Sequence, residues 1–398
     1  MEHEIIRNRN IVLFSFMPWN GKIASNFKEM AYEMAKHNRV LFIDRAPDRI
    51  SSLRNKQSEH INAKTGIEQI NENLWVYYPS TVVESINWIP VNFVYDILSK
   101  RNTKRLAEEI KPVIDQLHFD NAILINDNDF FRGIGLKQLL GSSDYIFYIR
   151  DYLTYQPYFR KHGPRMEKKL FNDVDLVVAN STYLANYGKK FHKESYDIGQ
   201  GCELDSYLAT GLPVPEDLQN IPKPIVGYTG AISGTRLDKD IIGHIAEKMP
   251  ELSVVLVGPF TDNFDHDSLE RFRNIYFLGS KPPAAIPSYV YHFDVCMNPQ
   301  QVNQMTVGNY PRKADEYLAM GKPMVATETE AMQMFSDHVF LCKTKEDYVE
   351  SIKKILSQPS MLNGEEKVRR KEFAMSHTWE ESIGKLGDAF HQSKKNKR

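Results

Sequence analysis

Short runs of apolar residues alternate with amphipathic segments along most of the chain. The runs at 11–16, 40–44 and 145–149 are rich in β-branched and aromatic residues. Continuous runs of this kind predict strands that are buried on both faces of a parallel sheet. The segment 27–36, which follows the first run, has the spacing of an amphipathic helix. Strands that alternate with helices predict a doubly wound α/β domain.

This alternation is interrupted once and then starts again. The segment 208–224 contains four prolines and few apolar runs, so it is predicted to be a linker. A new strand is predicted at 225–230 and a helix at 238–249. Another helix, at 311–320, is expected to stop at the glycine that follows it. The chain should therefore hold two α/β domains, as its length of 398 residues also suggests.

The predicted domain boundaries follow from these changes in pattern. Residues 1–207 form the first domain, 208–224 the linker and 225–377 the second domain. Residues 378–398 form an amphipathic helix, which is expected to pack back on the first domain.

Composition narrows the classes of function. Apolar residues make up 42% and charged residues 25% of the chain, as in globular proteins, and the net charge of −1 makes nucleic acid a poor default partner. The three cysteines form no CxxC pair, which indicates reduced thiols. No apolar run reaches the roughly 20 residues of a membrane span, and no signal peptide is recognisable. A cytoplasmic protein is predicted, at most peripheral at the inner membrane face.

Six short motifs in the second half of the chain follow one another in an order that is typical of one protein family. They are VGYTG at 226–230, LVG at 256–258, NIYFLG at 274–279, IPSYV and FDV within 286–295, EYLAMGKPMVA at 316–326, and HTWE at 377–380. Together they resemble the nucleotide-sugar-binding domain of GT-B glycosyltransferases, in particular the large retaining family 4. The segment PRKADEYL at 311–318 is similar to enzymes of surface-polysaccharide and teichuronic-acid assembly.

This resemblance implies a fold and an activity. The fold would be α/β, with two Rossmann-like doubly wound domains facing a cleft. The activity would be transfer of a sugar from a nucleoside diphosphate sugar to a hydroxyl of a saccharide or lipid-linked saccharide, in bacterial cell-surface polysaccharide synthesis. The nucleotide sugar would be a co-substrate, with no resident cofactor and no bound metal.

The predicted donor site begins in the turn after the strand at 225–230. Gly230 and Gly234 would let the backbone approach a phosphate, and the following helix amino terminus would favour an anion. Arg236 in the same turn could pair with phosphate bidentately. A plain tight turn with a surface arginine is the alternative. The glycine spacing differs from the dinucleotide fingerprint, which disfavours an NAD-dependent oxidoreductase.

The resemblance assigns further donor residues to the helix at 311–320. Glu316 matches the glutamate that holds the ribose hydroxyls, while Lys313 would meet phosphate and Pro311 belongs to the same nucleotide-binding motif. Gly308 stands where the family commonly has a second glutamate, so Gly308 and Asn309 are placed on the donor-sugar side. This departure leaves open the sugar and the stereochemical outcome. It also leaves two alternatives, a non-catalytic partner subunit and a nucleotide-sugar epimerase.

The first domain is expected to hold the acceptor. Asp151 follows a predicted strand, at the edge where open sheets bind ligands, and is the favoured catalytic base; a structural helix cap is the alternative. His162 is a competing candidate on the acceptor side. Trp19 and Gly21 follow the first strand and are also placed there, although a packed-core tryptophan is an equal alternative. The basic residues between 160 and 169 are interpreted as a solvated helix face.

Overall fold

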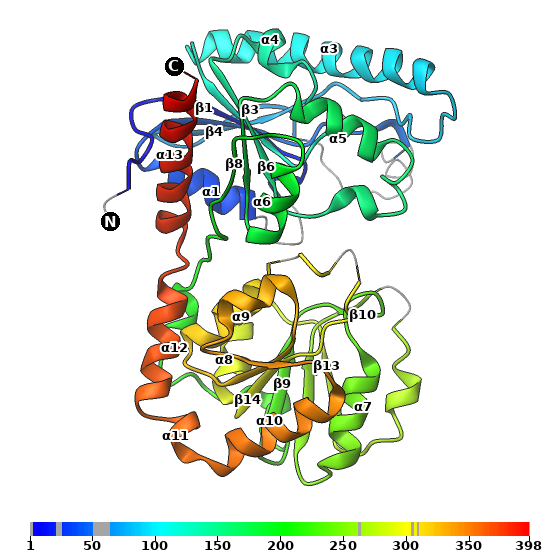
Figure 1. The fold of residues 1–398 in the computed structure, drawn as a ribbon, viewed down its shortest axis with the longest axis vertical. Coiled ribbons are helices and arrows are strands. Elements are labelled where there is room, and N and C mark those ends of the chain that lie inside the picture. The colour runs from blue at the N-terminus through cyan, green and yellow to red at the C-terminus, as the bar shows by residue number, and fades with distance from the viewer. Residues whose placement is uncertain are drawn as a thin grey trace. The chain divides into compact units, whose positions relative to one another are not determined.

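The computed structural model describes residues 3–20, 26–50, 64–261, 264–303, 306–308 and 310–397. The chain divides into two compact units (Figure 1). Unit 1 comprises Met1–Gly201 together with Trp379–Arg398, and unit 2 comprises Cys202–Thr378. None of the helices in the described ranges combines the length and the apolar character needed to cross a lipid bilayer.

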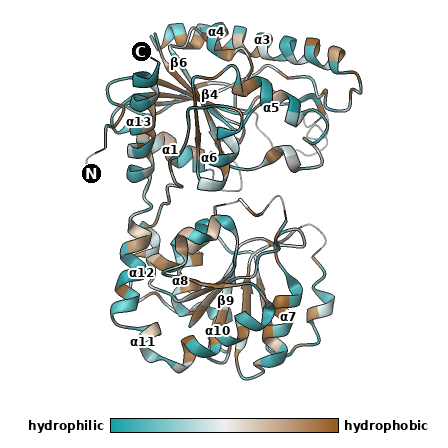
Figure 2. Ribbon diagram, viewed as in Figure 1, coloured by the Kyte–Doolittle hydropathy of each residue, from teal (hydrophilic) through white to brown (hydrophobic). Residues whose placement is uncertain are grey.

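Unit 1 is built on an eight-stranded sheet in the order β3-β4-β2-β1-β5-β6-β7-β8. Its strands are β1 Asn10–Phe14, β2 Arg39–Ile43, β3 Gly66–Asn71, β4 Leu74–Tyr78, β5 Ile123–Asp127, β6 Asp144–Ile149, β7 Leu176–Ala179 and β8 Ser195–Asp197. β3 pairs with β4 in the antiparallel direction, and every other pair is parallel. The parallel strands are largely apolar (Figure 2), whereas the edge strand β3 alternates between exposed and half-buried residues.

Helices cover both faces of this sheet. They are α1 Asn26–Ala35, α3 Asn92–Gln116, α4 Leu136–Leu140, α5 Gly163–Phe171, α6 Thr182–Lys189 and α13 Trp379–Asn396. Successive side chains of a strand point to opposite faces. Val12 therefore belongs to one core cluster and Leu13 to the other. Helix α13 packs against α1, and Trp379 Nε1 donates a hydrogen bond to Glu29 Oε2 at 2.8 Å.

Unit 2 has a six-stranded, wholly parallel sheet in the order β13-β11-β9-β14-β15-β16. Its strands are β9 Ile225–Thr229, β11 Ser253–Val257, β13 Ile275–Gly279, β14 Val295–Asn298, β15 Met324–Thr327 and β16 Phe340–Cys342, beside a small pair, β10 Ile232–Ser233 and β12 Phe260–Thr261. The strand order reverses direction between β9 and β14. In open α/β sheets, ligands bind outside the carboxyl ends of the strands at this switch point.

The helices of unit 2 are α7 Lys239–Lys248, α8 Ile286–His292, α9 Arg312–Ala319, α10 Lys345–Ser357, α11 Pro359–Leu362 and α12 Glu365–Met375. Helix α9 packs against α12. It ends before Gly321, whose φ of +72° is readily adopted by glycine. The buried Arg370 of α12 donates from Nε to the carbonyl of Gly321 at 3.0 Å, so the end of α9 is fixed by a neighbouring helix.

The chain passes between the units at two neighbouring points. Cys202 N donates to the carbonyl of His377 at 3.0 Å, and this contact lies within unit 2. The segment predicted as a linker, 208–224, belongs to unit 2, because Leu218 is buried in the core of that unit. Four prolines exclude regular structure over most of this segment, but they do not prevent a loop from packing.

Candidate functional site

A pocket of about 190 Å³ lies in unit 2 at the carboxyl ends of β9 and β14. It is formed by the end of β9, the turn that precedes α7, the loop after β14, and the first turn of α9. Its lining residues are Tyr228, Arg236, Leu237, Asn298, Gln300, Thr306, Tyr310, Pro311, Arg312 and Lys313. The pocket therefore occupies the switch point of the sheet, where a ligand is expected.

Gly230 marks the sharp turn after β9. Its φ is +134°, and its N–H donates to the carbonyl of Val257 at 2.9 Å. A Cβ atom on Gly258 would lie only 1.9 Å from the carbonyl oxygen of Gly230. The two turns can approach this closely because Gly258 has no side chain.

Lys313 reaches from α9 toward this turn. Its Nζ donates to the hydroxyl of Tyr228 at 3.0 Å and lies 4.5 Å from the centroid of that ring. A Cβ on Gly230 would be 3.2 Å from the same Nζ. The Tyr228 hydroxyl in turn donates to the carbonyl of Ala231 at 3.0 Å. The aromatic face and the hydroxyl thus hold an ammonium group beside the glycine turn.

The first turn of α9 carries positive charge and has no capping side chain. Its N-cap residue is Pro311, which is buried, and Arg312 and Lys313 follow. The amino terminus of α7 is different, because Asp238 accepts from the N–H groups of Asp240 and Ile241. The sequence-based expectation of an anion at the start of α7 is therefore wrong, since a carboxylate already occupies that position. The start of α9 is the terminus suited to an anion.

Glu316 lies one turn further along α9. Its Oε1 is 3.6 Å from Nε of Arg312, and the hydroxyl of Tyr207 forms a hydrogen bond with its carboxylate. Burial raises the pKa of Glu316, while the charges of Arg312 and Lys313 act in the opposite direction. The side chain keeps 19% of its surface exposed and does not line the pocket itself. Its ion pair with Arg312, which does line the pocket, holds the Glu316 carboxylate next to it.

The turn at 233–238 is held by the loop after β14. The carbonyl of Arg236 accepts from Gln301 N at 2.8 Å, and Asn303 Nδ2 donates to the carbonyl of Thr235 at 3.0 Å. Gly234 is partly buried in this turn, and the side chain of Arg236 is exposed at the pocket. The predicted residues Gly230, Arg236, Pro311 and Lys313 are thus brought together.

The loop on the predicted donor-sugar side is well packed where it is described. Thr306 Oγ1 donates to the carbonyl of Gln301 at 2.5 Å, and Gln300 Nε2 donates to the carbonyl of Thr306 at 2.8 Å. Gly308 is buried, and Asn309 lies outside the described residues. The carboxylate that commonly stands at position 308 in the resembling family has no counterpart at this glycine.

Sequence reasoning missed a buried polar cluster behind the pocket. The fully buried Asp315 accepts from His377 Nδ1 at 2.7 Å, from the hydroxyl of Tyr310 at 2.8 Å and from Cys202 Sγ at 3.4 Å. Burial raises the pKa of the Cys202 thiol well above its usual range, so this group is a neutral donor. The signal was present, because Asp315 lies in the PRKADEYL segment and His377 in the HTWE motif.

On the acceptor side, Asp151 is half-buried just beyond β6. Its carbonyl accepts from Asn128 Nδ2 at 3.0 Å. The preceding Arg150 forms a two-pronged ion pair with the buried Asp127. The next helical turn, Leu153–Tyr155, has Tyr152 as its N-cap residue and no side-chain cap, so Asp151 is not a helix cap here.

Two residues predicted on the acceptor side belong to the interior of unit 1. Trp19 is 4% exposed and packs edge-on against Phe42, with ring centroids 4.8 Å apart. His162 is buried, stacks on Tyr95 at 3.8 Å and forms a hydrogen bond from Nε2 to the carbonyl of Ile89 at 2.8 Å. Neither ring presents a face to an acceptor, which corrects that expectation. Gly21 lies outside the described residues.

Unit 1 has its own pocket, of about 100 Å³, beyond the carboxyl ends of β1, β2 and β5. It combines aromatic and hydrogen-bonding side chains, as small-molecule sites do. Its lining includes Phe16, Arg45, Asn87, Tyr95, Tyr158 and Phe159. This pocket, rather than Trp19 or His162, is the candidate acceptor surface of the unit.

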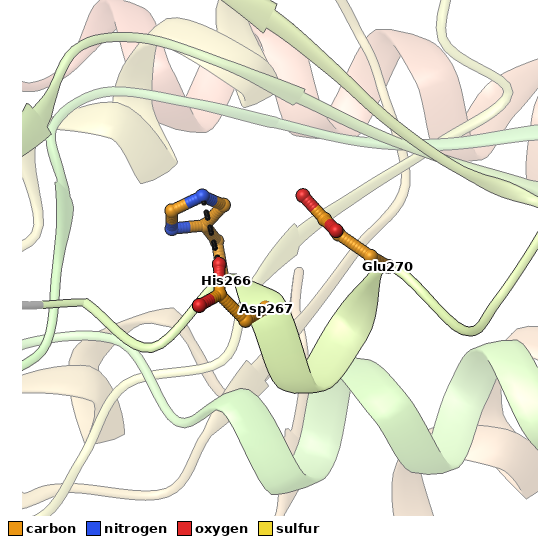
Figure 3. A group of neighbouring side chains, drawn as sticks. All are labelled: His266, Asp267 and Glu270. Atoms are coloured by element: carbon orange, nitrogen blue, oxygen red, sulfur yellow. Dashed lines mark ion pairs between the residues drawn. The ribbon is translucent and has the colours of Figure 1, made fainter.

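One group of three potential metal ligands occurs among the described residues: His266, Asp267 and Glu270 (Figure 3). His266 Nε2 is 3.2 Å from Asp267 Oδ1, and its ring packs 5.0 Å from that of Phe260. Asp267 and Glu270 are exposed. Exposed carboxylates remain hydrated without a metal, so this geometry alone does not establish a metal site.

The segment of the chain that forms the unit 2 pocket matches a known protein family. Residues 223–358 match the family model described as Glycosyl transferases group 1. This range contains the glycine turns, the loop after β14 and all of α9. Residues 223–358 are a group 1 glycosyltransferase domain. The pocket of unit 2 is thus a feature of the group 1 domain.

A curated relative of this chain comes from Bacillus subtilis (strain 168). It is named teichuronic acid biosynthesis glycosyltransferase TuaH, and it is 26% identical over 239 residues. The match covers 55% of this chain and 57% of the relative, so the chain aligns with little more than half of that protein.

Solved structures resemble the whole chain, not only the group 1 domain. Sucrose-phosphate synthase from Thermosynechococcus elongatus matches with a TM-score of 0.68 and 14% identity, over 98% of this chain and 100% of that one. Anabaena Alr3699/HepE in complex with UDP matches with a TM-score of 0.64 and 16% identity, over 96% and 100%. The predicted GT-B fold, with two Rossmann-like domains, is confirmed by these matches.

Proposed function

We propose that this protein transfers a sugar from a nucleoside diphosphate sugar to a hydroxyl group of a saccharide acceptor. The observation that carries the proposal is the position of Lys313. This residue of the group 1 domain is held by Tyr228 beside the Gly230 turn, at the sheet's switch point. Structures of the fold relative HepE contain UDP, UDP with glucose, and UDP-glucose, which supports a nucleotide sugar as donor.

In this proposal, the diphosphate lies against the first turn of α9. Lys313, Arg312 and Arg236 surround the pocket and supply positive charge. Their charge would stabilise the negative charge that develops on the diphosphate as the bond to the sugar breaks. Glu316 would accept hydrogen bonds from the two ribose hydroxyls, because a carboxylate can accept from both members of a vicinal diol. The proposal requires no resident cofactor and no metal.

Unit 1 would bind the acceptor, and Asp151 would be the general base. The acceptor oxygen forms the new bond to the sugar's anomeric carbon, the nucleoside diphosphate leaves, and the acceptor proton moves to the Asp151 carboxylate. The likeness to TuaH supports an acceptor in bacterial cell-surface polysaccharide synthesis. In this proposal the protein acts at the cytoplasmic side of the membrane. A lipid-linked saccharide is such an acceptor.

The test is calorimetric titration with UDP, GDP, ADP, dTDP and CMP. We expect micromolar binding of one nucleotide, and binding about tenfold or more weaker in Glu316→Gln. The exposed Glu372 on α12 provides the matched control, Glu372→Gln, which should bind as the wild type does. Absence of binding by all five nucleotides would overturn the proposal.

A non-catalytic partner subunit is the second candidate, because Gly308 replaces the family's usual glutamate. Nucleotide binding without release of nucleoside diphosphate, even with a panel of saccharide acceptors, would favour this candidate. Conversion of the donor into an isomeric nucleotide sugar without acceptor would instead indicate an epimerase.

A further inference from the structure

Unit 1 exposes a compact group of large apolar side chains at the start of α3. Trp88 is 71% exposed and Phe93 is 73% exposed, and Ile97 is 53% exposed. Val91 and Val94 between them are exposed too. We call these five residues the α3 apolar surface. Single exposed apolar residues need no explanation, but a contiguous group of this kind marks an interaction site.

The helix period places three of these side chains together. Phe93 and Ile97 are one turn apart on α3, as are Val94 and Ile97. Tyr95 and Ser99 lie on the opposite side of the helix and are buried. The first turns of α3 are therefore amphipathic, with one face in the core and an apolar face toward solvent.

Cations surround this apolar surface. Lys100, Arg101, Lys104 and Arg105 occupy the next two turns of α3 and are exposed. From the start of α5, Lys161 Nζ donates to the carbonyl of Trp88 at 3.0 Å. The basic residues near 160–169 thus flank the α3 apolar surface and are more than a solvated helix face.

Acidic groups do little to reduce this positive charge. Asp96 is the one acid in residues 86–105. It is bonded to both Arg165 and Lys169, at 2.6 Å each. Glu84 is paired with Arg49, and Glu108 lies 3.7 Å from Lys104. Lys100, Arg101 and Lys161 add to an excess of positive charge around the apolar side chains.

We propose that the α3 apolar surface docks unit 1 on a bilayer that contains anionic phospholipid. The apolar side chains would enter the boundary between head groups and acyl chains, with Trp88 at the interface that tryptophan favours. The surrounding lysines and arginines would meet the head-group phosphates. Helix α3 would lie on the membrane and not cross it, because its charged residues continue through the middle of the helix.

The unit 1 pocket shares its wall with this surface. Asn87 lines the pocket and directly precedes Trp88, and its Nδ2 donates to the carbonyl of Tyr158, another lining residue, at 3.4 Å. Docking would therefore place the pocket close to the bilayer surface, where the saccharide of a lipid-linked acceptor is presented. This consequence rests on the proposed function, whereas the docking itself does not.

Vesicle co-sedimentation of the full chain tests the docking. We expect binding to phosphatidylcholine vesicles that contain phosphatidylglycerol, and much weaker binding to pure phosphatidylcholine. Trp88→Ser/Phe93→Ser and Lys100→Glu/Arg101→Glu should each weaken binding by about tenfold or more. The controls are Val368→Ser, at a residue of unit 2 that is also 53% exposed, and Lys189→Glu/Lys190→Glu, at exposed lysines outside the surface. The controls should bind as the wild type does.

A second readout reports on Trp88 directly. Brominated lipid should quench the tryptophan emission of the wild type in the anionic vesicles, and Trp88→Phe should lose most of this quenching. Trp19 and Trp379 are buried, so they should contribute little to it. Equal vesicle binding by wild type and all patch variants would overturn the proposal.

Absence of wild-type binding to anionic vesicles would also overturn it. Self-association that is lost in Trp88→Ser/Phe93→Ser, without vesicle binding, would assign the surface to a second copy of the chain. Nucleotide calorimetry on the same samples separates this result from the donor proposal. Intact nucleotide binding without vesicle binding refutes the docking alone, and the reverse result refutes the donor assignment alone.

Discussion

His377 donates a hydrogen bond from Nδ1 to Oδ1 of Asp315 over 2.7 Å. Asp315 is fully buried and belongs to α9, whereas His377 follows α12. The bond therefore ties the helix that carries Lys313 and Glu316 to the segment where the chain leaves unit 2. Two residues that are separated by 62 positions along the sequence meet in one buried cluster.

Asp315→Asn should destabilise unit 2 by about 2 kcal/mol, because one amide oxygen cannot replace a carboxylate that accepts from His377, Tyr310 and Cys202. Denaturant unfolding measures the change. The exposed Asp337 offers the control Asp337→Asn, which should leave the free energy of unfolding within about 0.5 kcal/mol of wild type. Equal stability of the two variants would show that the cluster contributes little.

Gly258→Ala should disrupt the glycine turns of the pocket. Its Cβ would lie 1.9 Å from the carbonyl oxygen of Gly230, so the backbone of one turn has to move. We expect a loss of roughly 3 kcal/mol of unfolding free energy, together with weakened nucleotide binding. In Gly279→Ala nothing lies within 4 Å of the new Cβ and only the φ of +70° is unfavourable, so the cost should be about 1 kcal/mol. Similar losses in both variants would argue against the close approach of the turns.

Lys313→Met should separate phosphate recognition from nucleoside recognition. Removal of the ammonium should weaken binding of the preferred nucleoside diphosphate by about tenfold, and should change nucleoside binding little. Calorimetry with both ligands measures the difference. Lys248→Met, at an exposed position in the last turn of α7, is the control. A parallel loss for both ligands would mean that Lys313 supports the pocket's shape and does not bind phosphate.

Glu167 should make unit 1 less stable as the pH rises from about 4.5 to 7. Burial raises the pKa of this carboxyl from 4.5 to about 7, and the hydroxyl of Tyr187 is bonded to it. Between these values the folded state binds more protons than the unfolded state, so unfolding free energy falls with pH and levels off above 7. The full effect is about 3 kcal/mol, at about 1.4 kcal/mol per pH unit.

Glu167→Gln should flatten this pH dependence and stabilise the protein at pH 8. Tyr187→Phe should shift the fall in stability to higher pH, since the lost hydroxyl had lowered the pKa of Glu167. Denaturant unfolding at a series of pH values measures both effects. A slope in Glu167→Gln equal to that of the wild type would assign the pH dependence to other groups.

Much of the fold could be predicted from the sequence. Residues that are apolar at every position, as at 145–149, can be buried only where both faces of a strand are covered, and β6 is fully buried in the middle of a parallel sheet. A glycine after a strand or a helix predicts a turn from the local sequence alone, and Gly230 and Gly321 both adopt the positive φ that such turns use. The order of the motifs identified the group 1 domain, because five of the six lie within residues 223–358.

The burial of single side chains could not be predicted. Trp19 follows a predicted strand and His162 lies in a basic stretch, so either could face an acceptor, but α1 and β2 enclose the first and Tyr95 covers the second. The two helix starts are a different case, because Asp238 is the N-cap residue of α7 whereas Pro311 is that of α9. An aspartate at an N-cap is a local signal, so this difference could have been predicted.

The sequence by itself determined the strands, the glycine turns and the family of the second half, because these depend on residues close together in the chain. The tertiary structure alone decided which charged groups meet. Lys313 reaches Tyr228 across 85 positions, and Asp315 reaches His377 across 62. Such contacts are fixed by the packing of α9 against β9 and α12, since an ammonium or a carboxylate acquires its role from the groups that surround it.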